Sequence, residues 1–188
     1  MKKFSCVQGC SDCCIYREHY PSVEYGKIGV LLLPEEKQLI EDLARKLKVK
    51  VKILPRLAVG KNLPEKVIAY QMMGSNSDGD FCPFLDVESS ERSPHGGHNC
   101  RIYSERPLAC RAYPVIDVSS TATLDSHCQF CTKFSTARAS TDGLQQEIEA
   151  LSRIKARVTA GSDRVWRYAT ATGGPGDIML AEGWVADS

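Results

Sequence analysis

The stretch Cys6-Val-Gln-Gly-Cys10-Ser-Asp-Cys13-Cys14 holds four of the chain's nine cysteines. Thiolates that converge from distant segments are typical of zinc sites and iron–sulfur clusters. We therefore expect an irregular middle of the chain that metal–thiolate bonds hold in place. The other cysteines follow later in the sequence, at Cys82, Cys100, Cys110, Cys128 and Cys131.

A disulfide framework is the alternative, and it fits this sequence poorly. Cys13 and Cys14 are adjacent and can hardly pair with each other, and nine is an odd number. Residues 1–5 contain no apolar stretch that would direct the chain to an oxidising compartment. We expect metal ligation in a reducing cytoplasm.

Charge and hydropathy argue against two classes of function. Lys and Arg number 24 and Asp and Glu number 23, which leaves a net charge of +1 and argues against a dedicated nucleic-acid binder. The apolar run from Ile28 to Leu33 is far shorter than the roughly 18 residues of a membrane span. We expect neither a nucleic-acid partner nor a membrane segment.

Periodicity predicts elements on both sides of the cysteine-rich middle. A packing helix starts at Pro34 and runs to about Val49, and strands are expected over residues 49–54 and 67–72. Asp142 can cap a long C-terminal helix that ends near Gly161 or resumes through Trp166 and Tyr168. The last dozen residues are expected to be a tail that docks on the body or binds a partner protein.

These elements predict a compact α+β domain that is mostly helical. We expect residues 1–135 to form a cysteine-cluster metal-binding domain, with residues 136–188 as a C-terminal helix and tail packed on it.

Three arginines accompany the cysteines of the middle segment, at Arg101, Arg106 and Arg111. One interpretation is that their guanidinium groups offset thiolate charge and hydrogen-bond to sulfur around the bound cofactor. The other is that they pair at the surface with Glu88, Glu91 or Glu105. For Arg111 we favour the first. Pro107 is expected to start one short helical turn that presents Cys110, and Pro114 to end it.

Histidines are weaker ligand candidates than the thiols. The pair in His95-Gly-Gly-His98 could bind a metal, but the softer thiolates are plentiful nearby. His19 follows the first cysteines, and His127 stands beside Cys128, where a surface position or a supporting contact is the favoured interpretation.

The number of thiols bears on the identity of the metal. A zinc site takes four ligands, and Cys10-x2-Cys13 with Cys128-x2-Cys131 would supply them, but five cysteines would be left over. A polynuclear iron centre uses the surplus better, so we favour a [4Fe-4S] iron–sulfur cluster over zinc. The spacing Cys6-x3-Cys10-x2-Cys13 also matches radical S-adenosylmethionine enzymes. We interpret that match as coincidence, because only five residues precede Cys6 and alternating strand–helix units are absent.

Three motifs resemble the YkgJ-like cysteine-cluster family: the N-terminal cysteines that end in Cys13-Cys14, the motif Cys82-Pro-Phe-Leu, and the run Cys100-Arg-Ile-Tyr-Ser-Glu-Arg-Pro-Leu-Ala-Cys110-Arg-Ala-Tyr-Pro114. The resemblance covers residues 6–131. It implies a zinc- or iron-chelating domain, related to the flagellin lysine N-methylases, which are associated with an iron–sulfur cluster. The sequence departs from the family spacing Cys-x2-Cys-x2-Cys-Cys at Cys6, which three residues separate from Cys10.

The leading hypothesis is a cytoplasmic metal-binding protein for redox chemistry, sensing or iron handling. One alternative is a metal-cluster-dependent enzyme, such as a methyltransferase or oxidoreductase that acts on a protein or tRNA. Another is a zinc-stabilised module that binds a partner protein through its C-terminal helix and tail. The pool of candidate ligands comprises Cys6, Cys10, Cys13, Cys14, Cys82, Cys100, Cys110, Cys128 and Cys131.

Overall fold

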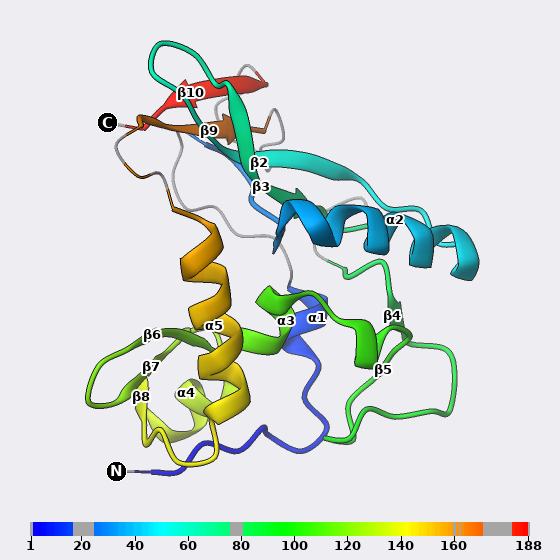
Figure 1. Ribbon diagram of the computed structural model, residues 1–188. Coiled ribbons are helices and arrows are strands. Elements are labelled where there is room, and N and C mark those ends of the chain that lie inside the picture. Colours follow the sequence, from blue (N-terminus) through cyan, green and yellow to red (C-terminus); the bar gives the residue numbers. More distant parts are fainter. Residues whose placement is uncertain are drawn as a thin grey trace. The chain divides into compact units, whose positions relative to one another are not determined.

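The computed structural model describes residues 2–16, 25–75, 81–159, 161, 163–170 and 182–187 (Figure 1). The chain divides into two compact units. We call residues 1–15 with 84–156 the cysteine unit, and residues 16–83 with 157–188 the sheet unit. Each unit is therefore assembled from two separate stretches of the sequence.

The sheet unit contains a five-stranded antiparallel sheet in the order β1-β3-β2-β9-β10. Its β2 starts at Ile53, so residues 49–52 of the predicted first strand lie outside it, whereas β3 closely matches the second prediction. The strands are β1 (Val30–Leu32), β2 (Ile53–Val59), β3 (Lys66–Met72), β9 (Val165–Ala169) and β10 (Gly183–Ala186).

The predictions for the C-terminal region are partly wrong. Trp166 and Tyr168 do not continue a helix but belong to β9, and part of the expected tail is β10, which pairs with it. The rings of Tyr168 and Trp184 meet edge to face with centroids 5.2 Å apart. Side chains two residues apart share one face of a strand, so Trp166 and Tyr168 fit a strand as well as a helix, and the pairing with β10 decides between them. The glycines and proline of residues 173–176 lie outside the described residues.

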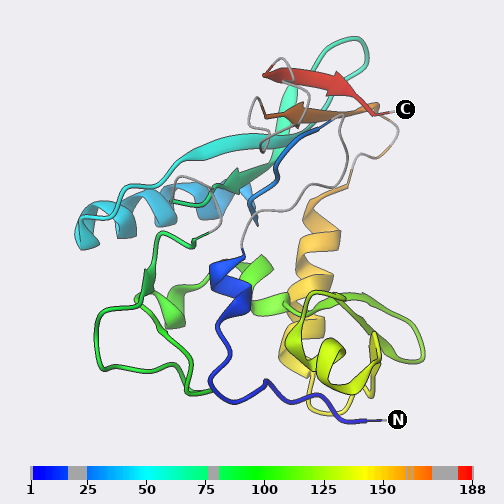
Figure 2. The same ribbon diagram turned by 180° about the vertical axis from the view of Figure 1, so that it is seen from behind.

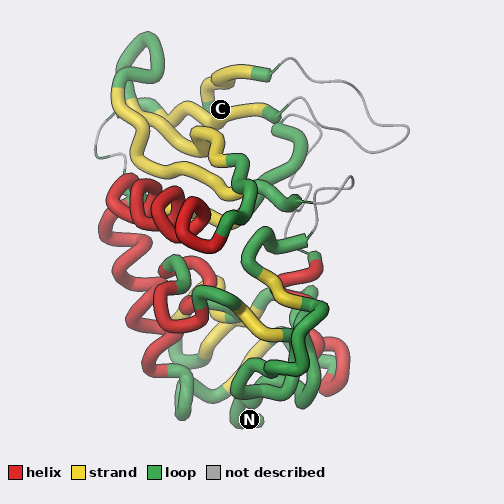
Figure 3. The backbone as a smooth tube through the Cα atoms, turned by 90° about the vertical axis from the view of Figure 1, so that its right-hand side faces the viewer, coloured by secondary structure: helices red, strands yellow, loops and turns green. Residues whose placement is uncertain are grey.

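Helix α2 (Pro34–Leu47) confirms the prediction for this segment. Pro34 occupies the first turn, where its missing N–H costs nothing, and the Glu36 carboxylate accepts the free N–H of Leu33 at 2.9 Å. The helix ends at Lys48, whose φ of 54° is left-handed. Ile40, Leu43 and Ala44 are buried, and α2 packs along β3 and β1 (Figure 3).

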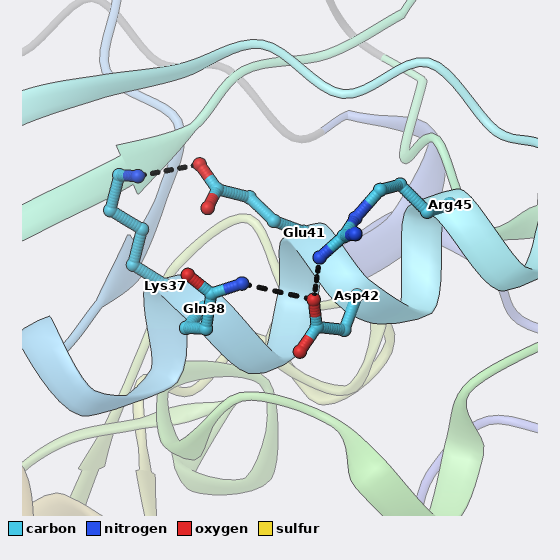
Figure 4. Close-up of polar contacts among 5 residues, drawn as sticks. All are labelled: Lys37, Gln38, Glu41, Asp42 and Arg45. Carbon is cyan, nitrogen blue, oxygen red and sulfur yellow. Dashed lines mark hydrogen bonds and ion pairs between the residues drawn. The ribbon is translucent and has the colours of Figure 1, made fainter.

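The opposite side of α2 carries polar pairs at helical spacing (Figure 4). Lys37 bonds to Glu41 at 2.5 Å, and Gln38 donates to Asp42 at 2.9 Å. Arg45 also bonds to Asp42. Exposed pairs of this kind are worth a few tenths of a kcal/mol each, about 0.2–0.5.

The cysteine unit is built from short elements around a small apolar core. Phe130, Leu124, Leu144, Ala122 and Ala139 are its most buried members. Its elements are α1 (Asp12–Ile15), β4 (Leu85–Asp86), β5 (Asn99–Cys100), the 3-10 turn η1 (Tyr103–Glu105), α3 (Leu108–Ala112), β6 (Val115–Val118), β7 (Ala122–Leu124), α4 (Gln129–Phe134), β8 (Arg138–Ala139) and α5 (Gln145–Arg157).

The prediction of a mostly helical fold is wrong. The described part of the chain is about 28% helix and about 28% strand, with three antiparallel sheets. In the cysteine unit, β4 pairs with β5, and β6, β7 and β8 form a three-stranded sheet. Several of these strands span only two or three residues. Such strands are too short for alternation to reveal, because they depend on pairing with distant partners.

No helix in the described residues is long and apolar enough to cross a lipid bilayer.

Gln71 provides a test of the sheet unit. Its side chain is fully buried on β3, accepts the N–H of Gly29 at 3.1 Å and donates to the Pro55 carbonyl at 3.1 Å. Gln71→Leu leaves both backbone groups unpaired, so we expect the free energy of unfolding in urea to fall by about 2 kcal/mol or more.

The matched control is Gln38→Leu on the exposed side of α2, which should change stability by no more than about 0.5 kcal/mol. If the two substitutions lowered the free energy of unfolding equally, the buried hydrogen bonds of Gln71 would add no more stability than an exposed polar pair.

Candidate metal centre

The first residues of the chain are anchored next to α4. The N-terminal segment can be followed as the blue ribbon in Figure 2. The N–H of Ser140 donates to the Lys2 carbonyl at 3.0 Å, and the Phe4 ring lies 5.1 Å from that of Phe130. Because α4 begins directly after Cys128, this docking brings Cys6 into the neighbourhood of Cys128.

A second anchor holds the residues around Cys10. The N–H of Gly9 donates to the His95 carbonyl at 2.8 Å, and the N–H of His98 donates to the buried Ser11 hydroxyl at 2.7 Å. Gly97 permits this contact, since a Cβ there would stand 2.2 Å from the Cys10 carbonyl oxygen. The loop 95–98 is therefore fitted against the N-terminal cysteines.

A third contact joins α1 to α4. The Gln129 side chain donates to the Asp12 carboxylate at 2.8 Å, across 117 positions of sequence. Asp12 lies between Cys10 and Cys13, and Gln129 directly follows Cys128. Sequence reasoning missed this pair, although the position of each residue beside a cysteine was the available signal.

The short helical turn that the sequence predicts around Cys110 is present as α3. Pro107 precedes α3, and its carbonyl accepts the N–H of Cys110 at 2.9 Å. The helix ends at Ala112, two residues before Pro114.

These anchors gather five thiols around one cavity of about 1040 Å³. The polar residues Gln146, Glu147 and Arg153 of α5 form another part of its wall, which the sequence did not reveal. The five cysteines that line the cavity are Cys6, Cys10, Cys13, Cys110 and Cys128.

The other four predicted ligands do not line this cavity. Cys131 lies in the apolar core with Phe130, and Cys100 pairs with Leu85 between β5 and β4. The Cys14 sulfur lies 3.9 Å from that of Cys13. Cys82 belongs to the sheet unit, where it is buried. All nine cysteines are free of disulfides.

The thiols at the cavity influence one another's titration. Burial raises the pKa of Cys6 from 9.0 to about 11, and the neighbouring Cys10 and Cys13 add to the shift. Burial also raises the pKa of Cys10 and of Cys128, and Cys128 is affected further by Cys6 and Cys10. These thiols are protonated at neutral pH, so a metal that binds them must displace protons.

The donor chemistry fits a metal bound through thiolates. Backbone N–H groups of Val7, Asp12, Phe130 and Cys131 hydrogen-bond to the sulfurs of Cys6, Cys10 and Cys128. Such bonds stabilise the ionised sulfur that a metal requires. Among the described residues, no three His, Cys, Asp or Glu side chains are already arranged to hold an ion.

Arg106 and Arg111 also line the cavity, whereas Arg101 does not. Arg106 stacks on the Tyr103 ring at 3.7 Å and donates to the Tyr103 carbonyl at 2.9 Å. Arg111 donates to the carbonyls of Arg106 at 2.8 Å and Ser104 at 3.0 Å. Within the described part of the chain, no ion pair joins either guanidinium to the glutamates considered above.

The remaining histidines differ in position. His95 lines the cavity. His127 is exposed and its ring bonds to Asp125 at 2.9 Å, away from the cavity wall. His19 lies outside the described residues.

Comparison with protein families gives one match. The sequence profile named CxxCxxCC, described as a putative zinc- or iron-chelating domain, matches residues 5–129. The chain belongs to this family. The matched residues include all five cysteines at the cavity, and the resemblance seen in the sequence is thereby confirmed. Family membership supports metal binding in general. Searches of curated proteins and of solved structures return no match.

The contact between Gln129 and Asp12 provides a test of how the site is positioned. Gln129→Ala removes no thiol but releases α1 from α4, so we expect metal affinity to fall about tenfold, as for other residues that orient ligands. Competition with a chromogenic chelator measures this loss. Gln146→Ala is the control, because Gln146 lines the same cavity from α5 and belongs to neither cysteine segment, and it should leave affinity unchanged.

The raised pKa of Cys6 predicts how the stability of the metal-free protein depends on pH. The folded state favours the protonated thiol, so its contribution is fully present below pH 9 and is lost as pH rises towards 11. We expect the melting temperature to fall over this range, and to fall less in Cys6→Ser. Parallel curves for the two proteins would contradict the assignment.

Proposed function

We propose that the chain binds an iron–sulfur cluster, of the [4Fe-4S] type, through thiolates of the cavity in the cysteine unit. The observation that carries the proposal is the convergence of five thiols from three separate stretches of sequence. A [4Fe-4S] cluster is held by four protein ligands, most often thiolates, and the cavity offers five thiols for this purpose. Four of them, Cys6, Cys10, Cys13 and Cys128, interact electrostatically. When bound, iron would supply a redox-active centre.

Charge on the cavity wall supports this proposal. Several thiolates gathered in one place carry more negative charge than a protein can hold uncompensated. Arg106 and Arg111 are held in place by backbone carbonyls, so their positive charge is available to the cavity. The sequence predicted three arginines, Arg101, Arg106 and Arg111, as contacts of the cofactor. Arg106 and Arg111 line the cavity, and Arg101 does not.

Zinc is the alternative metal. The sequence suggested one particular set of four zinc ligands, which can be compared with the cavity. The four-ligand set built from Cys10, Cys13, Cys128 and Cys131 includes one residue, Cys131, that does not line the cavity. A zinc site would more easily use Cys6 in place of Cys131, because Cys6 lines the cavity. Such a site would stabilise the unit without redox chemistry.

A cluster-dependent enzyme is the second candidate function. A cavity of about 1040 Å³ is at the upper end of the range for small-molecule sites, so it has room for more than a metal centre. Binding of S-adenosylmethionine, measured by calorimetry on the metal-loaded protein, tests the methyltransferase version. The absence of binding would count strongly against methyl transfer.

Anaerobic purification tests the metal directly. We expect a brown protein with a broad band near roughly 400 nm and matching contents of iron and sulfide. A colourless protein with stoichiometric zinc would overturn the cluster and support the zinc-stabilised module.

A pair of variants tests the ligand assignment. Cys128→Ser removes a thiol at the cavity, and we expect it to lose the metal. Cys131→Ser places a hydroxyl in the apolar core, so it should retain the metal while losing about 1–3 kcal/mol of stability. Metal loss in Cys131→Ser alone would contradict the assignment to the cavity.

A further inference from the structure

We propose that His95 is a nitrogen ligand of the metal held at the cavity, so that the centre has mixed cysteine and histidine coordination. This inference rests on the proposed function, since it concerns the same metal. It adds a ligand that lies on a loop far in sequence from the N-terminal cysteines and that the family's cysteine pattern does not include.

The backbone of His95 is fixed beside the thiols. Its carbonyl accepts the N–H of Gly9 at 2.8 Å, one residue before Cys10, and His95 lines the cavity together with Cys6, Cys10 and Cys13. The backbone contact therefore holds His95 at the same cavity as these thiols.

The two glycines after His95 explain why the loop can lie so close. A Cβ on Gly96 would stand 2.3 Å from the Gln8 side-chain nitrogen, and Gly96 has a φ of +79°, which side chains rarely adopt. A Cβ on Gly97 would stand 2.2 Å from the Cys10 carbonyl oxygen and 2.5 Å from the Ser11 hydroxyl. The two glycines therefore allow the loop to lie directly against the N-terminal cysteine segment.

The other described histidines are placed differently. The His127 ring bonds to Asp125, and neither His127 nor His98 lines the cavity. The ring of His95 forms no hydrogen bond or ion pair within the described part of the chain. His98 is held through its backbone by Ser11 and has a buried Nδ1 without a hydrogen-bond partner, so it is the competing candidate in the same loop.

Histidine ligation fits the chemistry of either metal. Neutral imidazole is an accepted ligand of zinc alongside thiolates, and histidine replaces cysteine on iron in some iron–sulfur centres, where it raises the reduction potential. Exchanging one thiolate for an imidazole also removes one negative charge from the centre. That lowers the charge that Arg106 and Arg111 must balance.

X-ray absorption at the edge of the bound metal tests the assignment on the full chain, purified without oxygen. Imidazole gives a characteristic outer-shell scattering that thiolates lack. We expect it in the wild type, its loss in His95→Ala, and its retention in His98→Ala. His95 is exposed, so its removal should not prevent folding.

A titration with Co²⁺ gives an independent measurement on the metal-free chain. We expect the visible bands of the bound cobalt to shift in His95→Ala and the affinity to fall by about tenfold or more. Gly97→Ala should shift the same bands, because the added Cβ pushes the loop off Cys10. His127→Ala is the control and should leave the bands unchanged.

The outcomes separate the two proposals. Sulfur-only coordination in a wild type that binds metal would overturn the role of His95 and leave the proposed function standing. Loss of imidazole scattering in His98→Ala alone would also overturn it. A wild type that binds neither iron, zinc nor Co²⁺ would overturn both.

Discussion

The candidate centre depends on the hydrogen bonds that hold residues 6–13 against distant parts of the cysteine unit. Gly9 bonds to the His95 carbonyl, Ser11 to the His98 amide, and Asp12 to the Gln129 side chain. Each contact joins segments more than 80 residues apart, so each works against a large loss of chain entropy. Without them, three of the five cavity thiols would have no defined position.

Apolar packing supports the same segment from its other end. Phe4 packs on Phe130, and Phe130 in turn meets Phe134 with centroids 4.8 Å apart. This packing fixes where the backbone of the N-terminal cysteines runs, so the apolar core helps to bring Cys6 to the cavity that Cys128 also lines.

Burial and backbone hydrogen bonding act in opposite directions on the pKa of these thiols. Burial and mutual repulsion raise the pKa of Cys6, whereas backbone N–H groups favour the ionised sulfur. A site with this balance stays protonated when empty and ionises when a cation arrives. Arg106 and Arg111 line the same cavity, held by backbone carbonyls, and their positive charge favours the ionised form.

The sequence by itself determined the chemistry of the centre and the elements with local signals. Nine thiols and their spacing indicated a metal, Pro34 and the apolar positions after it defined α2, and Pro107 and Pro114 bounded α3. The two helices could be predicted because capping and proline geometry depend only on residues close together in the sequence. Only the tertiary structure decided that Cys6 lines the cavity while Cys131 belongs to the core, and that Trp166 lies in a strand. Those outcomes depend on docking and strand pairing between distant segments, which no local pattern in the chain encodes.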